Sequence, residues 1–250
     1  MPARSSEPAP GRDARRTERL LATLREVELV GLMRGASNYT FLARLRPHGD
    51  DGLLAVYKPE RGESPLWDFA SGTLFKREVA AYELSKTLGW PRIPPTVVRK
   101  NGPHGIGAMQ LFVEADGRHF LSEQAARRDD WIRVALFDVL ANNADRKSSH
   151  CLFDAHDRVW VIDHGLTFHV DDKLRTVIWD FSGEALPRDV CGDLERALAQ
   201  LEHGKLGQTL ADLLSPAETR SLKRRLRAAL EPDWRFPSPT SGWSLPWPPV

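Results

Sequence analysis

The spacing of apolar residues predicts a β-rich first half of the chain. Residues 39–45 and 53–58 are apolar runs joined by a turn-rich connection, which predicts an antiparallel hairpin. Residues 95–98 and 106–113 repeat this pattern around a second turn. Between the hairpins, residues 74–88 carry apolar side chains three and four positions apart and end at a glycine, which predicts a helix.

Helices dominate the remainder of the pattern. Residues 17–28 have helical apolar spacing, and residues 131–142 form a strong, mostly apolar helix. Residues 215–218 read SPAE, a capping box with proline at the first helical position, which opens a helix in the mostly helical last third. Two short strands, residues 151–153 and 159–162, are expected around a turn.

Proline placement and this change of character predict the domain organisation. Nine of the 18 prolines lie near the two ends of the chain, so we expect both ends to be irregular. Residues 1–17 are predicted to be disordered, residues 18–113 to form a small β-rich lobe, and residues 114–230 to form a mostly helical lobe. The tail, residues 231–250, carries tryptophans and is expected to pack back on the body. The expected fold is therefore α+β and two-lobed, with a ligand cleft between the lobes.

Composition narrows the class of protein. The 250 residues include 35 basic and 34 acidic side chains, a net charge of +1, so a protein that coats nucleic acid is not expected. Two cysteines are too few for a disulfide scaffold. No apolar run approaches about 18 residues, so no transmembrane segment is predicted. The first residues lack the apolar core of a secretory signal. We expect a cytoplasmic monomer.

Two aspartates mark the segment with the densest chemistry. Asp145 lies in a polar stretch after the predicted helix 131–142, and Asp163 follows the second short strand and precedes a glycine. The intervening strand pair would bring them side by side at the cleft. Phosphoryl transfer uses such a pair, one carboxylate to position the attacking hydroxyl and another to hold the Mg²⁺ that bridges the phosphates.

The first half supplies groups suited to phosphate. Lys58 ends an apolar strand and Glu78 lies on the next helix, the combination by which kinases aim an ammonium group at phosphates. Gly35 opens a loop of small residues in which backbone N–H groups can approach phosphate, with Ser37 and Asn38 adding donors.

Each of these residues also has an ordinary structural explanation. Lys58 and Glu78 can be solvated charges, and Asp145 can be a structural partner of Arg146. Asp163 is harder to explain in this way, because an acid after a buried strand is costly without a partner. The order and spacing of the whole set favour phosphoryl transfer.

With these motifs the chain resembles the kinase-like group of phosphatidylinositol 3- and 4-kinases, especially the type II 4-kinases, and the HipA-type toxin kinases. The matching segments are residues 35–41 (GASNYTF), 55–59 (AVYKP), 143–146 (NADR) and 162–168 (IDHGLTF). It also resembles an uncharacterised bacterial family grouped with these kinases by similarity. The resemblance extends over about residues 31–185.

The resemblance implies a protein-kinase-like fold, an ATP substrate, Mg²⁺ and a role for each matching residue. Asp145 would be catalytic together with Arg146, Asp163 would hold the metal, and Glu78 would hold Lys58 on the phosphates. The cofactor-binding set would comprise Gly35, Ser37, Asn38, Lys58, Glu78, Gln110, Phe112 and Val113, the last three near adenine. The acceptor is expected to be a protein or small molecule, since the neutral charge does not favour a lipid surface.

His150 is the main departure from the family pattern. The related kinases carry an asparagine five residues after the catalytic aspartate as a second metal ligand, and here His150 takes that place. Imidazole is a poor ligand for Mg²⁺ but can bind Mn²⁺. Two alternatives therefore stay open, a nucleotide-binding pseudokinase or scaffold and a metal-dependent phosphohydrolase. The hydrolase would use His150, His156, Asp163, His164 and His169.

Overall fold

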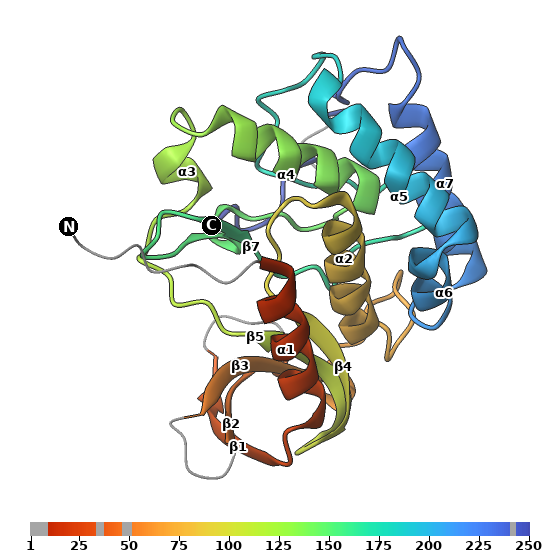
Figure 1. Cartoon of the computed structure of the whole chain (residues 1–250). Helices are drawn as coiled ribbons and strands as arrows, with labels where there is room; N and C mark the ends of the chain where they lie inside the picture. The colour runs from red at the N-terminus through yellow and green to blue at the C-terminus, as the bar shows by residue number, and fades with distance from the viewer. Residues whose placement is uncertain (1–9, 34–37, 47–51, 241–243) are drawn as a thin grey trace, which may run out of the picture. The chain divides into compact units, whose positions relative to one another are not determined.

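The chain folds into two compact units (Figure 1). In this computed structural model the described residues are 10–33, 38–46, 52–240 and 244–250. The first unit contains the described residues up to Ser64 together with Pro95–Phe112, and the second contains Pro65–Pro94 and Val113–Val250. The chain thus leaves the first unit for the last time beside the boundary expected near residue 114, whereas residues 65–94 group with the second unit.

The first unit is built on a five-stranded antiparallel sheet. Its strands are β1 (Glu26–Leu32), β2 (Phe41–Arg46), β3 (Leu53–Pro59), β4 (Thr96–Gly102) and β5 (Gly105–Leu111), in the order β1-β2-β3-β5-β4. Both predicted hairpins are present, β2–β3 and β4–β5, and β3 pairs with β5 between them. This pairing puts β3, which ends just beyond Lys58, at the centre of the sheet.

A helix completes the core of the first unit. Helix α1 (Pro10–Thr23) contacts β4 and β5, and its fully buried Leu21 packs with buried side chains of β2, β3 and β5: Ala43, Leu45, Ala55, Tyr57 and Met109. Arg99, buried on β4, donates from Nη1 to the carbonyl oxygen of Leu21 at 3.0 Å. This bond satisfies a carbonyl at the end of α1 that has no partner within the helix.

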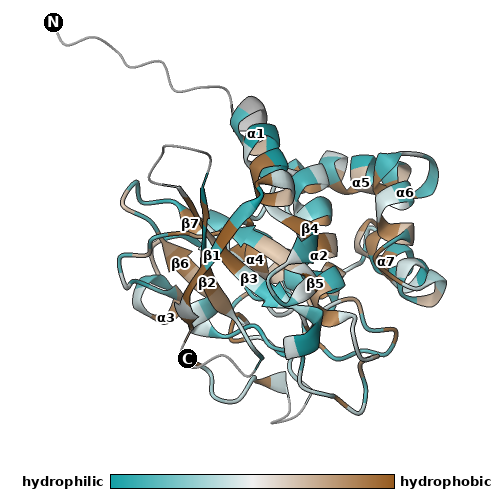
Figure 2. Cartoon of the chain, turned by 90° about the horizontal axis from the view of Figure 1, so that it is seen from below, coloured by the Kyte–Doolittle hydropathy of each residue, from teal (hydrophilic) through white to brown (hydrophobic). Residues whose placement is uncertain are grey.

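The second unit is mostly helical. Its helices are α2 (Leu74–Leu88), α3 (Phe120–Glu123), α4 (Arg128–Ala141), α5 (Cys191–His203), α6 (Lys205–Ala211) and α7 (Pro216–Ala229), with a hairpin of β6 (Cys151–Phe153) and β7 (Val159–Val161). Helix α2 packs against α5 and α6, and α4 and α5 pack against α7. Figure 2 shows hydrophilic and hydrophobic residues together on α5 and α7, as expected for helices with one buried face.

The α+β architecture predicted from the pattern, with a β-rich first part and a helical second part, is confirmed, and two elements near the start differ. Helix α1 spans Pro10–Thr23 rather than residues 17–28, so residues 10–17 are helical and not disordered. Residues 1–9 lie outside the described part of the chain. Strand β1 was not predicted, and it begins within the segment that was expected to be helical.

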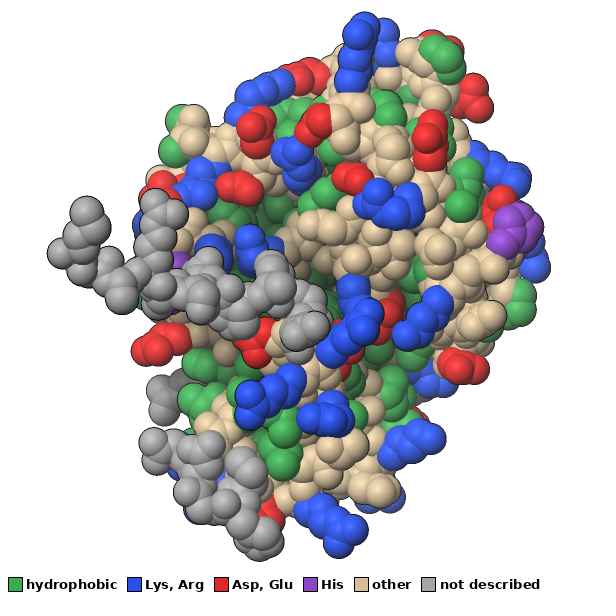
Figure 3. All heavy atoms as spheres, viewed as in Figure 1, with side chains coloured by type: hydrophobic (Ala, Val, Ile, Leu, Met, Phe, Trp, Pro, Cys, Tyr) green, Lys and Arg blue, Asp and Glu red, His purple; other side chains and the backbone are tan. Residues whose placement is uncertain are grey.

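The tail packs back on the second unit, as predicted. The amide of Thr176 donates to the carbonyl oxygen of Ser244 at 3.1 Å, and the amide of Ser148 donates to that of Pro249 at 2.8 Å. Ser244 is buried, whereas Trp247 is 89 % exposed. Basic and acidic side chains are interspersed on the face drawn in Figure 3. No helix of the described residues is long and apolar enough to cross a membrane.

Candidate active site

Two residues predicted to contact phosphate lie on the first unit. Lys58 lies on β3 opposite Ala108, and a side chain at Gly107 would approach the carbonyl oxygen of Lys58 to 2.4 Å, so the strands meet here only because residue 107 is glycine. The Oδ1 atom of Asn38 accepts a hydrogen bond from the amide of Ser64 at 2.7 Å. Gly35 and Ser37 lie outside the described residues.

The predicted adenine-binding residues lie where the chain leaves the first unit. Gln110 is buried on β5, and its Nε2 atom donates to Oγ1 of Thr96 at 2.8 Å. Phe112 is the last residue of the first unit and Val113 the first of the second in this crossing. The side-chain amide of Gln110 is thus used within the sheet.

The loop that carries Asp145 is fixed by the end of α4. Asn142 ends that helix with a φ of 51°, a left-handed conformation that asparagine tolerates. Asn143 is buried, donates from Nδ2 to Asp138 at 2.9 Å, and accepts from the amide of Asp145 at 3.0 Å. Both asparagines therefore hold the loop rather than face solvent.

Arg146 braces the loop from inside the second unit. Its side chain is fully buried and pairs with the fully buried carboxylate of Asp138, with the closest approach at 2.9 Å. The guanidinium also donates to the carbonyl oxygen of Ile162 at 2.9 Å and lies 2.8 Å from Nε2 of His164. Arg146 thus joins α4 to the turn around Asp163, and its burial makes it a positioning residue.

Asp145, unlike its neighbour Arg146, is partly exposed. Its side chain is 26 % exposed and accepts from Nζ of Lys147 at 2.9 Å. Burial raises the pKa of the Asp145 carboxyl above its usual value; Lys147 opposes this shift, and the negative charge of Asp163 adds to it. A carboxylate of raised basicity beside a second carboxylate can accept a proton from a hydroxyl group.

Asp163 lies in a strained turn held by Glu78. Its φ is 60°, and its side chain is 49 % exposed. Glu78 is buried on α2, and its Oε2 atom accepts from the amide of His164 at 3.0 Å. The Nε2 atom of His150 lies 3.4 Å from Oδ2 of Asp163. The second unit therefore brings Glu78, His150 and Asp163 together, whereas the sequence analysis assigned Glu78 to Lys58.

Asp163 offers a donor suited to a hard divalent cation, and His150 beside it offers one suited to Mn²⁺. Mg²⁺ is commonly held in kinases by one or two carboxylates together with substrate phosphates, and Asp163 offers an accessible carboxylate for this. Within the described residues no group of three or more His, Cys, Asp or Glu side chains could hold a metal by itself. Asp163 and His150 are thus compatible with a metal that is shared with phosphate.

The other histidines of the hydrolase alternative are used elsewhere. His164 is buried against Arg146, His156 donates its amide to Asp154 in the β6–β7 turn, and Nε2 of His169 lies 2.8 Å from the carbonyl oxygen of Asp68. None of these contacts joins His150 and Asp163 into a larger ligand cluster. The described residues give no support to a hydrolase centre of this kind.

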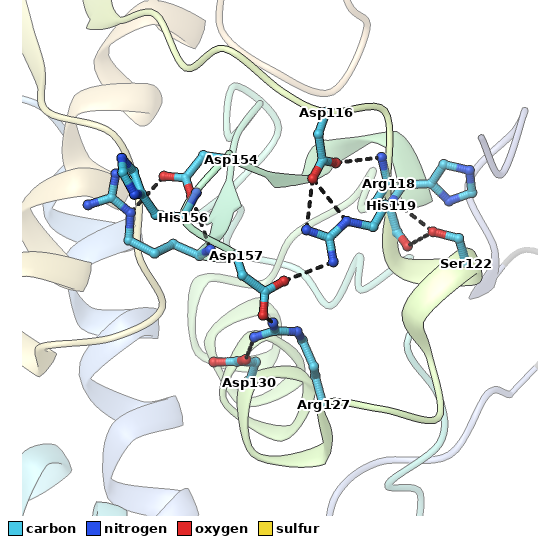
Figure 4. A network of polar contacts seen from close by, with 10 residues as sticks. Asp116, Arg118, His119, Ser122, Arg127, Asp130, Asp154, His156 and Asp157 are labelled. Atoms are coloured by element: carbon cyan, nitrogen blue, oxygen red, sulfur yellow. Dashed lines mark hydrogen bonds and ion pairs between the residues drawn. The ribbon is translucent and has the colours of Figure 1, made fainter.

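A network of ion pairs anchors the β6–β7 hairpin that separates Asp145 from Asp163 (Figure 4). Asp157, in the hairpin turn, pairs with Arg118 at 2.8 Å and with Arg127. Both guanidinium groups lie over the buried ring of Phe153, at 4.6 and 5.2 Å from its centroid. Asp154 accepts from Trp160 and Arg158 within the same turn. The hairpin is thereby tied to the start of α4.

Asp138 is the main functional position that the sequence analysis missed. A signal was present, because Asp138 is an acid on an otherwise apolar helix face and such an acid needs a partner. The identity of that partner, Arg146 eight residues later, depends on the loop conformation and was not visible in the pattern.

Comparisons with known proteins were made in sequence and structure. No family model matches the chain. Protein Rv2133c of Mycobacterium tuberculosis is 36 % identical in an alignment 259 positions long, which covers 89 % of this chain and 92 % of that protein.

Three similar solved structures are kinase-like. The Helicobacter pylori proinflammatory kinase CtkA has a TM-score of 0.50 at 13 % identity, covering 82 % of this chain and 91 % of that one. Hydra Fam20 with sugar has a TM-score of 0.51 at 14 % identity, covering 92 % of this chain and 91 % of that one. The Golgi casein kinase has a TM-score of 0.52 at 14 % identity, covering 90 % of this chain and 76 % of that one. At these identities the likeness shows a protein-kinase-like fold.

Proposed function

The chain belongs to the family of that mycobacterial protein, and we propose that it is an ATP-dependent phosphotransferase that moves the γ-phosphoryl group to a hydroxyl of a protein or soluble molecule. The observation that supports this most is the convergence, in the second unit, of Glu78, Asp163 and the loop that carries Asp145. Positioned carboxylates of this kind are what phosphoryl transfer asks of a protein, because most of its catalysis is positioning and charge stabilisation.

Asp145 is the group that takes the proton of the attacking hydroxyl. Its partial exposure leaves an oxygen accessible, while Asn143 and Lys147 fix its orientation. Because burial raises its pKa, its carboxylate is a better base than a fully solvated one. Arg146 is fully buried against Asp138 and supports this role through the loop.

Asp163, with His150 beside it, would hold the divalent cation. When bound, Mg²⁺ or Mn²⁺ would neutralise charge on the phosphates. Lys58 and the loop with Gly35, Ser37 and Asn38 are assigned to the phosphates. The segment from Gln110 through Phe112 to Val113 is assigned to adenine. The specific likeness to phosphatidylinositol or HipA-type kinases belongs to this proposal as well.

Arg175 is proposed to contact an acceptor with negative charge. Its side chain is exposed, and its carbonyl oxygen accepts from the amide of Arg146 at 2.9 Å, one residue from Asp145. Lys173, which precedes it, is instead paired with Asp68 at 2.8 Å. The acceptor side of the loop therefore carries one exposed cation near the base.

ATP binding and phosphoryl transfer test the proposal directly. We expect ATP with Mg²⁺ or Mn²⁺ to raise the melting temperature, and labelled γ-phosphate to appear on acceptor or on the protein itself. Asp163→Asn should reduce transfer by about 100-fold or more, equivalent to about 2.7 kcal/mol of transition-state stabilisation. Asp171→Asn, at an exposed carboxylate eight residues later, is the matched control and should leave transfer unchanged. No melting shift with either metal would overturn the proposal.

A nucleotide-binding protein without turnover is the second candidate, favoured by the 3.4 Å contact of His150 with Asp163. In that case ATP binds but no phosphate is transferred. His150→Asn restores an amide oxygen at the position of the missing second metal ligand. A gain of phosphoryl transfer would show that the absence of this ligand prevents turnover in the wild type. Unchanged activity would count against this explanation.

A further inference from the structure

We propose that Arg77, which is buried, and Glu218, which is 12 % exposed, form a clamp that positions Glu78 at the Asp163 turn, with a catalytic consequence that rests on the proposed function. Neither residue was singled out by the sequence. Glu218 was expected only as part of a capping box. The clamp would make the carboxyl group of Glu78 a fixed part of the second unit.

The clamp joins three segments of the second unit. Arg77 lies on α2 and is 3 % exposed; its Nη1 atom donates to the carbonyl oxygen of Thr167 at 2.6 Å, and its Nη2 atom bonds Oε1 of Glu218 on α7. The guanidinium lies 4.9 Å from the ring centroid of Phe69. Glu218 is itself held, because its Oε2 atom accepts from the amide of Ser215 at 2.8 Å.

Arg77 and Glu78 hold opposite ends of one short loop. Successive residues on a helix point about 100° apart, so the two side chains reach different atoms. Glu78 accepts from the amide of His164, directly after Asp163, and Arg77 donates to Thr167 three residues later. A shift of α2 would therefore break both contacts. The bond from Arg77 to Glu218 resists such a shift, because it ties α2 to α7, a helix that is not part of this loop.

The burial of Arg77 makes the clamp strong. Burial would raise the pKa of the Glu218 carboxyl, but the charge of Arg77 and the hydrogen bonds it receives lower the pKa below its usual value. Removing one partner of a buried ion pair leaves the other charge desolvated, which is far more disruptive than the loss of an exposed pair. A cavity of about 460 Å³ lined by Arg77 and Glu218 leaves room for the pair to be reversed.

Hydrogen exchange at the His164 amide tests the clamp without any assay of activity. We expect Glu218→Gln to speed exchange at this amide by about tenfold or more, because weaker anchoring of α2 frees the bond to Glu78. Glu202→Gln is the matched control: Glu202 of α5 forms its ion pairs with Lys223 and Arg227 of α7 rather than with Arg77, so the substitution should leave exchange at His164 unchanged.

Reversal of the pair separates a specific clamp from a general loss of stability. The double variant Arg77→Glu with Glu218→Arg should exchange at His164 more slowly than either single variant. If it does not fold, Arg77→Lys, which keeps the charge, should fall between wild type and Glu218→Gln. Unchanged exchange at His164 in Glu218→Gln, with faster exchange confined to α7, would overturn the proposal.

A double-mutant comparison tests the catalytic consequence. If the clamp acts through Glu78, then Glu218→Gln lowers phosphoryl transfer in the wild-type background and has no further effect in a Glu78→Gln background. Equal losses in both backgrounds would overturn the positioning role. A wild-type protein that transfers no phosphate would refute the proposed function alone, because the exchange result would still decide the clamp.

Discussion

Replacing Asp138 by asparagine tests the brace beneath the catalytic loop. Asp138 and Arg146 are both fully buried, and the carboxylate accepts from Nε and Nη2 of Arg146 and from Nδ2 of Asn143 at 2.9 to 3.1 Å. Asparagine keeps the shape but removes the charge. The guanidinium of Arg146 is then left desolvated without the carboxylate that balanced its charge.

The size of the effect follows from this burial. Breaking a buried ion pair costs about 3–5 kcal/mol, out of a total stability of about 5–15 kcal/mol for a typical protein. For a chain of this length each kcal/mol corresponds to about 2–4 °C in melting temperature. Asp138→Asn should therefore lower the melting temperature by about 6–20 °C.

Thermal and urea unfolding, followed by circular dichroism, measure this loss. Asp130→Asn on the same helix is the control, because its pair with Arg127 is exposed and should contribute less than about 1 kcal/mol. The double variant Asp138→Leu with Arg146→Met should be less destabilised than Asp138→Asn, since no charge remains buried. A loss below about 1 kcal/mol for Asp138→Asn would refute the assignment of Arg146 as a brace.

Three further outcomes are expected. Lys147→Met removes a positive charge that lowers the pKa of Asp145, so the pKa of Asp145 should rise further. The acid limb of the pH–rate profile should then move to higher pH. An acid limb that stays in place contradicts the role of Asp145 as base. Burial would raise the pKa of Asp154, but hydrogen bonds from Trp160, Arg158 and two backbone amides lower this pKa to about 2. The Asp154 carboxylate therefore stabilises the fold above its unfolded pKa near 3.8, and this stabilisation is lost as the pH falls toward 2. Asp154→Asn should remove about 2 kcal/mol at pH 7 and flatten this acid dependence in urea titrations. Deleting residues 244–250 removes the bond from the Ser148 amide and should lower the melting temperature, which a thermal scan would detect.

Local signals were enough to predict several elements of the fold. Helix α2 begins and ends where the spacing and Gly89 predict, and β6 has its predicted bounds, because caps, turns and periodicity act within a few residues. Strand β1 was missed because its stability comes from β2, including an ion pair between Glu28 and Arg46 at 2.8 Å. Pro10 was taken as a sign of irregular chain, yet proline fits the first turn of a helix.

The same distinction holds for the candidate site. Asp145 and Asp163 could be paired from sequence because a short hairpin lies between them and a hairpin returns the chain to its starting edge. The partners of Arg77 could not be predicted in this way. Glu218 is 141 positions away, and its contact exists only after α2, α6 and α7 have packed. The proximity of Asp145 to Asp163 was therefore predictable from the sequence, whereas the contacts of Arg77 were not.

The backbone at Asp163 decides which substitution can isolate its charge. A φ of 60° is a sparsely populated conformation that costs about 1–3 kcal/mol, and a residue keeps it only where its neighbours hold it in place. Here the amide of His164 binds Glu78, and the amide of Ala144 binds the carbonyl oxygen of Leu166. Asparagine adopts the left-handed region more readily than most residues, so Asp163→Asn removes the charge and keeps the turn. Asp163→Ala would change both, and a loss of transfer in that variant would not distinguish a missing metal ligand from a collapsed turn.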